Sequence, residues 1–175
     1  FDVSTASYDS NFSVSSQENA PTGLAFNSNG TKMFVIGWAG DDVNEYTLST
    51  GFDVSTASYD SNFSVSSQES TPQGLAFNSN GTKMFVIGSS DDVNKYTLST
   101  GFDVSTASYD SDFKVESQES APKGLAFNSD GTKMFVTGYH GDDVNEYTLS
   151  TGFNLVDDST APTTTFSPAN SATAV

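Results

Sequence analysis

The chain has 175 residues and carries 22 Asp and Glu against 6 Lys and Arg, which gives a formal net charge of −16. This excess of acidic groups argues against nucleic acid and anionic membrane surfaces as partners, because both reward clustered Lys and Arg. The chain contains no cysteine, so disulfides and thiolate metal sites are excluded.

An internal repeat organises the sequence. Its copies cover residues 1–51, 52–101 and 102–152, and each begins with Phe-Asp-Val-Ser-Thr-Ala-Ser-Tyr-Asp-Ser. A fixed period of this kind identifies the fold unit. A fourth copy starts at Phe153 and fails within a few residues. Because the chain starts at a Phe rather than at Met, we expect it to be a fragment or a processed piece.

Four strands are predicted in each copy. In the first copy the apolar alternation and its flanking Gly, Asn, Asp and Ser residues place them at residues 8–15, 23–27, 32–36 and 42–49. The turn Asn-Ser-Asn-Gly joins the second and third strands into a β-hairpin, which recurs in both later copies. Helical periodicity is absent, so the fold class is all-β.

Three all-β folds use four strands in a repeat of about 40–50 residues: propeller blades, β-trefoil units and β-prism sheets. The copies read Pro-x-Gly-Leu-Ala-Phe-Asn-x-Asp/Asn-Gly-Thr-Lys-x-Phe-Val, followed by Asp-x-Val-x-x-Tyr-x-Leu. Over residues 1–152 this pattern resembles bacterial β-propeller repeats of the NHL and YVTN-like kind. The resemblance implies that the strand at 24–27 is innermost and that the strand at 8–15 is outermost. The β-trefoil and the β-prism remain alternatives because both close with three repeats.

On this resemblance the chain supplies three four-stranded blades, one of them split between the termini. Three blades are too few for a closed ring, since propellers have about four to eight. We therefore expect a head-to-tail homodimer that forms a six-bladed ring. The N-terminal outer strand of each chain would complete the last blade of the other.

The composition changes after Phe153. Residues 153–175 contain Thr-Ala-Pro and then Phe-Ser-Pro-Ala, and this segment resembles the linker and first strand of a bacterial Ig-like domain. The resemblance implies a larger parent protein that is extracellular or attached to the cell surface. A disordered tail rich in Ser, Thr and Pro is the alternative.

No catalytic constellation is recognisable in the sequence: the chain has one histidine, His140, and no phosphate-binding glycine loop. An Asp pair stands at the start of the last predicted strand of every copy. Oxygen ligands suit Ca²⁺, so Asp42, Asp92 and Asp143 are candidate calcium ligands, and no other cofactor is expected. The alternative is that these side chains cap turns.

Differences between the copies concentrate in two loops, one before the predicted inner strand and one after the hairpin. In a propeller these loops emerge on one face. Substitution there predicts a ligand surface, on which the only Trp and a Tyr offer flat apolar faces to a sugar ring or a protein. The alternative is neutral drift. The candidate ligand-binding residues are Thr22, Trp38, Gln73, Ser89, Ser90, Lys123, Tyr139 and His140.

Two functions remain open. The first is a non-catalytic binding or adhesion module whose ligand is a glycan or a protein. The second is an enzyme of the lactonase type with a metal in the central channel, as in several propellers with similar repeats. The near identity of the copies favours the first, because such metal sites draw different residues from different blades.

Overall fold

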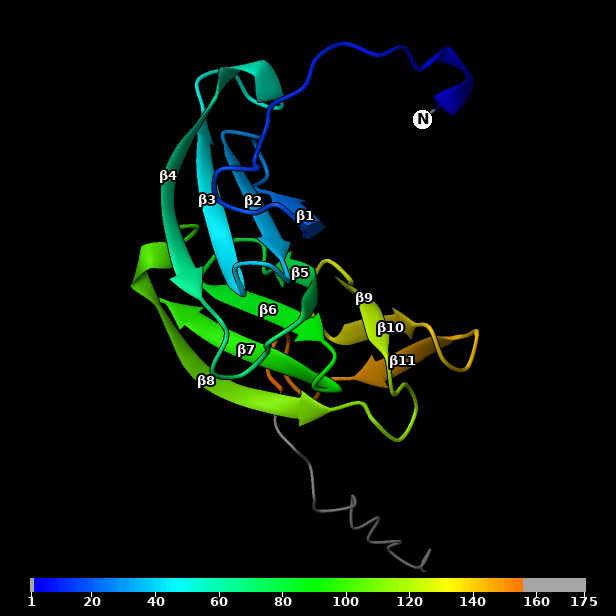
Figure 1. Ribbon diagram of the computed structural model, residues 1–175. Coiled ribbons are helices and arrows are strands. Elements are labelled where there is room, and N and C mark those ends of the chain that lie inside the picture. The colour runs from blue at the N-terminus through cyan, green and yellow to red at the C-terminus, as the bar shows by residue number, and fades with distance from the viewer. Residues whose placement is uncertain (1, 156–175) are drawn as a thin grey trace, which may run out of the picture.

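The computed structural model describes residues 2–155 and contains three antiparallel sheets, which follow one another along the chain (Figure 1). The first sheet has the order β1-β2-β3-β4, the second β5-β6-β7-β8, and the third β9-β10-β11. The strands are β1 (Pro21–Phe26), β2 (Lys32–Gly37), β3 (Asp42–Leu48), β4 (Ala57–Ser64), β5 (Pro72–Phe77), β6 (Lys83–Gly88), β7 (Asp92–Leu98), β8 (Ala107–Lys114), β9 (Pro122–Phe127), β10 (Lys133–Gly138) and β11 (Val144–Thr148).

The predicted hairpin is confirmed in every copy, and its turn is built by side chains. Asn27 Oδ1 accepts a hydrogen bond from the backbone N–H of Lys32 at 3.0 Å, and Asn29 Oδ1 accepts one from Thr31 N–H at 3.1 Å. Gly30 has φ +72°, a left-handed conformation that glycine adopts without strain. The Asn-Ser-Asn-Gly sequence is therefore sufficient to specify the turn that joins β1 to β2.

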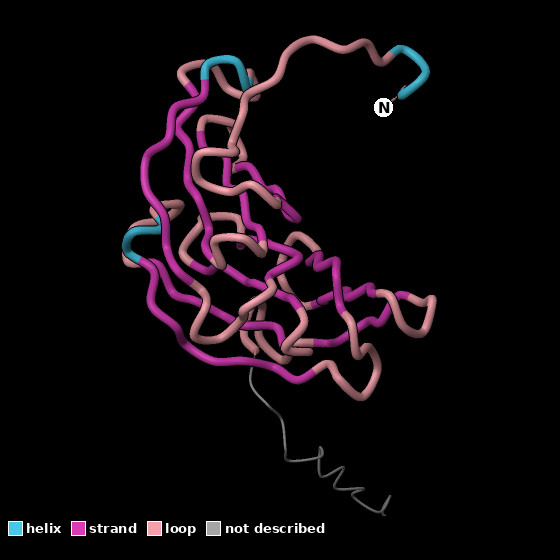
Figure 2. Tube along the Cα trace, in the orientation of Figure 1, coloured by secondary structure: helices cyan, strands magenta, loops and turns pink. Residues whose placement is uncertain are grey.

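The outer strand forms only where a neighbouring strand can pair with it. β4 pairs with β3 and β8 pairs with β7, which confirms the predicted outer strands of the second and third copies. The prediction of a strand at residues 8–15 is wrong for the isolated chain, because this segment has no paired partner and is irregular (Figure 2). The third sheet correspondingly ends at β11, whose outer edge is open among the described residues.

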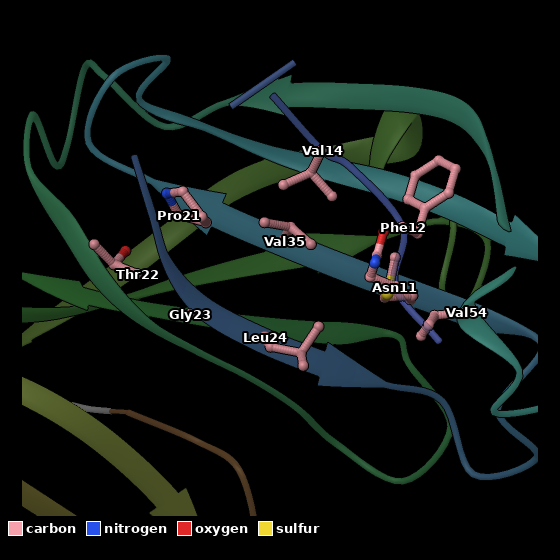
Figure 3. Close-up of a pocket in the computed structure, with 10 residues that line it drawn as sticks. Asn11, Phe12, Val14, Pro21, Thr22, Gly23, Leu24, Val35 and Val54 are labelled. Carbon is pink, nitrogen blue, oxygen red and sulfur yellow. The ribbon is translucent and has the colours of Figure 1, made fainter. Parts of the chain in front are cut away.

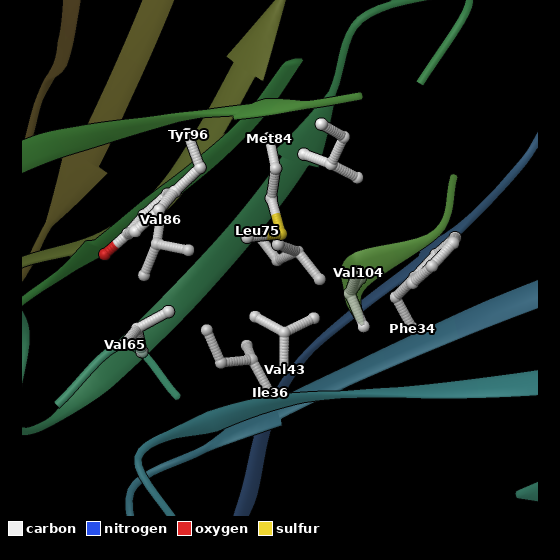
Figure 4. Packing of buried hydrophobic residues seen from close by; sticks show 10 residues of the cluster. Phe34, Ile36, Val43, Val65, Leu75, Met84, Val86, Tyr96 and Val104 are labelled. Carbon is white, nitrogen blue, oxygen red and sulfur yellow. The ribbon is translucent and has the colours of Figure 1, made fainter. Parts of the chain in front are cut away.

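Face-to-face packing of consecutive sheets makes the core. Phe34, Ile36 and Val43 of the first sheet lie against the second sheet (Figure 4). Their counterparts Phe85 and Ile87 of the second sheet lie against the third. Both faces of the second sheet are covered in this way. Where the first sheet packs on the second, the second sheet and its adjoining loops contribute Val65, Leu75, Met84, Val86, Tyr96, Leu98 and Val104.

The phenylalanine that starts the third copy, Phe102, closes the packing between the first and second sheets. Phe102 has φ +61°, a left-handed backbone that is unusual for a bulky residue. Its ring lies 5.6 Å from that of Phe77 and 6.1 Å from that of Phe34 on the preceding sheet. A Cβ at Gly81 would meet the Phe102 ring at 2.3 Å. The hairpin glycine is therefore required twice, for its backbone conformation and for the space it leaves.

Within the described residues, no helix is long and apolar enough to cross a membrane. The three helical segments are one-turn 3-10 helices: η1 (Val3–Thr5), η2 (Val54–Thr56) and η3 (Val104–Thr106).

Candidate functional site

The two variable loops of each copy meet at one end of its sheet, as the sequence predicted. In the first sheet Pro21, at the start of β1, pairs with Gly37, at the end of β2. In the third sheet the backbone N–H of Tyr139 donates to the carbonyl of Ala121 at 3.0 Å. We call these loops the rim. It comprises residues 18–22 with 38–41, residues 69–73 with 89–91, and residues 119–123 with 139–142.

Three buried glutamates, which the sequence analysis did not single out, hold the rim loops in place. Glu18, Glu69 and Glu119 are each 1% exposed. Glu69 accepts hydrogen bonds from Thr71 N–H at 2.9 Å, and from the backbone N–H and the hydroxyl of Ser90 at 3.0 and 2.5 Å. One carboxylate thus joins the loop before the inner strand to the loop after the hairpin. The sequence feature that could have revealed these glutamates is an acidic residue that recurs in every copy inside a loop of small polar residues.

The glycine that ends the hairpin gives each glutamate its room. A Cβ at Gly37 would lie 2.4 Å from Cδ of Glu18 and 2.4 Å from the carbonyl oxygen of Ala20. Gly88 makes the corresponding approach to Glu69 at 2.5 Å. A larger residue at this position would push the two rim loops apart.

Exposed aromatic side chains stand on this anchored frame. Trp38 is 56% exposed and Tyr139 is 74% exposed. The rings of Tyr139 and His140 contact each other edge to face at 5.2 Å. Because the loops beneath them are fixed through buried carboxylates, these rings offer apolar area with little ordering of the backbone on binding. The second sheet has no aromatic here, since Ser89 and Ser90 occupy the loop.

The other three predicted ligand residues lie beside one another at the inner strands. Thr22 Oγ1 donates to the carbonyl of Pro72 at 2.8 Å and so bridges β1 to β5. A Cβ at Gly74 would meet the carbonyl oxygen of Lys123 at 2.8 Å, which shows how closely β5 and β9 approach. Thr22, Gln73 and Lys123 therefore form one row, in which Thr22 and Lys123 are exposed and Gln73 is half-buried.

The aspartates predicted as calcium ligands are bound within their own sheets. Asp42 accepts from Asn44 Nδ2 at 2.7 Å and from Asn62 Nδ2 at 2.6 Å. Asp92 pairs with Lys114 Nζ at 2.7 Å, and Asp143 accepts from Asn145 Nδ2 at 2.8 Å. Over residues 2–155 no group of three acidic or histidine side chains is arranged to hold a metal ion. Calcium binding stays a prediction.

Asp91 stands in a crowded acidic setting at the rim. It has φ +63°, and its Oδ1 is buried without a hydrogen-bond partner. Burial, followed by the nearby charges of Glu116, Asp92, Glu69 and Glu119, raises the pKa of Asp91 above its usual value. A raised pKa in the folded state means that folding favours the protonated form. The associated stability is present below the unfolded pKa and is lost as the pH rises through the folded pKa.

Asp91→Asn is therefore expected to raise the melting temperature at pH 7, by about 1–3 °C. Asparagine keeps the shape and tolerates the left-handed backbone. The gain should shrink as the pH falls toward 4, where the wild-type carboxyl takes up its proton. Asp130→Asn is the control, because hydrogen bonds from Thr132 lower the pKa of Asp130 and the other copies carry Asn there. A gain of equal size in both variants would mean that net charge alone is responsible.

No family model matches the sequence, and no curated protein matches it. Solved structures do resemble the fold. A protein from Bacteroides uniformis described as a candidate 6-phosphogluconolactonase aligns with a TM-score of 0.55 and 13% identity, over 74% of this chain and 37% of that one. A luciferin-regenerating enzyme gives 0.54 and 18%, over 77% and 47%. A functionally unknown protein from Desulfotomaculum acetoxidans gives 0.56 and 14%, over 75% and 40%.

These similarities are those of an all-β fold with repeated four-stranded antiparallel sheets. The chain spans less than half the length of each of these structures.

Proposed function

We propose that the three sheets are blades of a β-propeller and that the chain is a non-catalytic binding or adhesion module. Its ligand, a glycan or a protein surface, would bind on the rim. The observation that carries this proposal is the pair of exposed rings, Trp38 and Tyr139, on loops anchored by buried glutamates. In Glu18 and Glu119 the carboxylates accept from Gly40 N–H at 3.0 Å and from His140 N–H at 3.1 Å.

The chemistry of the rim favours a neutral or cationic ligand. Exposed indole and phenol rings offer flat apolar faces with polar edges, which suit sugar rings and protein patches. The net charge of −16 disfavours anionic ligands. We further propose, from the resemblance of residues 153–175 to the start of an Ig-like domain, that the module belongs to a larger secreted or surface protein. Residues 156–175 lie outside the described part of the chain.

Replacing Trp38 and Tyr139 together with Ser is expected to abolish binding to glycans or proteins that the wild-type chain retains. Both side chains are exposed, so the melting temperature should change by no more than a few degrees. A glycan array followed by calorimetry on each hit makes the measurement. The control is Tyr59→Ser, which removes a 43% exposed ring from the outer strand β4. Undiminished binding by the double variant, or its unfolding, would contradict the proposal.

A second candidate function is lactone hydrolysis with a metal in the central channel. The observation that favours it is the fold similarity to the protein described as a candidate 6-phosphogluconolactonase. In a propeller the channel would be lined by the row of Thr22, Gln73 and Lys123, which differ between the copies. A lactone-hydrolysis assay with and without added divalent metal separates this candidate from the binding module. Metal-dependent turnover would establish the enzyme.

If the Asp pairs bind calcium, millimolar calcium should raise the melting temperature by mass action on the folded state. Asp42→Asn should then reduce the shift, because it removes a carboxylate ligand. Binding at this position would require calcium to displace the side-chain amides of Asn44 and Asn62 from the two Asp42 oxygens. Magnesium at the same concentration is the control for ionic screening. Superimposable melting curves in calcium and in a chelator would show that the folded chain does not bind calcium.

A further inference from the structure

We propose that the uncovered face of the first sheet is the docking surface for the third sheet of a second copy of this chain. The contact would be head to tail and would occur twice, so that two chains close one ring. This assembly is independent of what the rim binds.

The kind of contact that we propose between chains already occurs twice within one chain. Between the first and second sheets, Phe34, Ile36 and Val43 pack on Val65, Leu75, Met84, Val86 and Val104. Between the second and third sheets, Phe85, Ile87 and Val93 pack on Val115, Leu125, Met134, Val136 and Leu155. The two sets occupy equivalent positions of successive copies. We call the face that carries Phe34, Ile36 and Val43, or their equivalents, the donor face of a sheet. The opposite face, which carries Leu75, Met84 and Val86 or their equivalents, is its acceptor face. Each sheet therefore has one face of each kind.

None of the described residues covers the acceptor face of the first sheet. This face forms a hollow lined by Phe12 and by the equivalents of the buried acceptor set: Val14, Leu24, Met33, Val35 and Val54 (Figure 3). Leu24 is 60% exposed, whereas its counterpart Leu75 is 8% exposed. The ring of Phe52 is 61% exposed and, among aromatic rings, contacts only that of Phe26 in its own sheet, while Phe102 also packs on the preceding sheet through Phe34.

The donor face of the third sheet is likewise uncovered in the part of the chain that the structure describes. Val144 is 65% exposed, whereas Val43 and Val93 are fully buried. Phe135 is half-buried, whereas Phe34 and Phe85 are fully buried. Thr137 stands where the other copies have Ile, so this contact buries less apolar area than the internal ones. A donor face and an acceptor face built from the same repeat are thus both left open on one chain.

A polar contact specifies the register of the proposed interface. Glu45 on β3 reaches the next sheet, where its Oε2 accepts from the backbone N–H of Val104 at 2.9 Å. Lys95 on β7 likewise donates to Asn154 Oδ1 at 3.0 Å. The next residue in this series is Glu146, which is exposed and bonded only to Lys133 within its own sheet. In the assembly Glu146 would accept from the backbone N–H of Val54 in the second copy.

The open strand edges match in the same register. Within residues 2–155, β11 has no outer partner and residues 8–15 belong to no sheet. The segment nevertheless already lies where an outer strand should be, because Phe12 contacts Tyr46 edge to face at 5.6 Å. Phe63 and Phe113 contact Tyr96 and Tyr147 in the same way at 5.5 and 5.4 Å. From the pairings Val43 with Phe63 and Val93 with Phe113, we infer that Val144 pairs with Phe12 of the second copy.

The number of copies in the proposed ring is set by the sheets that residues 2–155 form. These residues form three sheets, and closed rings of such sheets contain about four to eight. Two copies of the 175-residue chain supply six sheets, which lies within this range. The two contacts are then identical and related by a two-fold axis, and the heterologous interface closes without leaving an edge.

Sedimentation equilibrium of the 175-residue chain tests the proposal. We expect about 37 kDa, twice the 18.5 kDa of one chain. Leu24→Asp places a charge on the open acceptor face and should shift the mass to that of one chain, without loss of the β-sheet circular dichroism. Ser79→Asp adds the same charge to an exposed turn of the second sheet and should leave the dimer intact.

Removal of residues 1–15 provides an independent variant, because it deletes the outer strand while leaving β1–β11 unchanged. It should also yield the single-chain mass. A wild-type mass of 18.5 kDa at micromolar concentration, or any mass other than twice that value, would overturn the proposal. So would a Leu24→Asp variant that is folded and still dimeric.

Discussion

Phe85→Ala is expected to lower the free energy of unfolding by about 3–5 kcal/mol. The Phe85 side chain is fully buried between the second and third sheets, with its ring 4.5 Å from that of Phe127. Truncation removes this aromatic contact and leaves a cavity that the two sheets can fill only by moving together. Urea denaturation followed by circular dichroism gives the change directly.

Phe135→Ala is the matched control, because it is the same residue one copy later on a face that the single chain leaves open. Measured on a monomeric background such as Leu24→Asp, it should cost about 1–2 kcal/mol, in keeping with partial burial. Equal costs for the two substitutions on that background would contradict the packing described here. On the dimeric wild type the cost of Phe135→Ala should rise toward that of Phe85→Ala.

Glu69→Ala is expected to destabilise the chain by roughly 2–4 kcal/mol, because the part-buried hydrogen bonds from Thr71 N–H, Ser90 N–H and Ser90 Oγ–H lose their charged acceptor. Glu69→Gln keeps the size but offers one acceptor oxygen, so it should lie between the wild type and Ala. Thermal and urea denaturation give the magnitudes. Hydrogen exchange at Ser90 should quicken in both variants as the rim loop is released.

Glu116→Ala serves as the control for Glu69, since it removes an exposed glutamate from the corresponding loop region of the next copy. It should change stability by no more than about 0.5 kcal/mol. If Glu69→Ala behaves like Glu116→Ala, the carboxylate does not anchor the rim, and the rigidity assigned to Trp38 and Tyr139 loses its basis.

The local elements were predictable from the sequence because local chemistry specifies them. The turn at Asn27–Gly30 needs only its own side chains and a glycine with positive φ. The alternation of apolar residues then placed β1, β2 and β3 within two residues of their observed bounds. The strand order within a sheet was predicted from the resemblance to propeller repeats, and the observed order agrees with it. Short antiparallel connections between neighbours are the physical basis of this order.

The environment of each copy was not predictable in the same way. Leu24 and Leu75 have the same neighbours in sequence, yet one is 60% exposed and the other 8% exposed. Burial of this kind depends on whether another sheet stands alongside, which a repeat pattern cannot say. The prediction of a strand at residues 8–15 was wrong for this reason, because a strand needs a partner edge for its backbone hydrogen bonds.

The position of the candidate site was predictable from the sequence, but the buried glutamates that hold its loops in place were not. Loop variation pointed to Trp38 and Tyr139, which are exposed. The anchoring role of Glu69 escaped notice because glutamate in a polar loop normally faces solvent. Its burial results from the close approach of Gly88 and Thr71, which are distant from one another in sequence.

Site-specific photocrosslinking tests the central claim, that the third sheet of one chain covers the first sheet of another. Benzoylphenylalanine in place of Phe135 should crosslink two chains, with the adduct on peptides that contain Phe26 or Phe52. These residues are equivalent to Phe77 and Phe102, which surround Phe34 at 4.5 and 6.1 Å. Isotopically mixed chains distinguish adducts between chains from those within one chain. Adducts confined to one chain, or formed between chains at any other surface, would contradict the account.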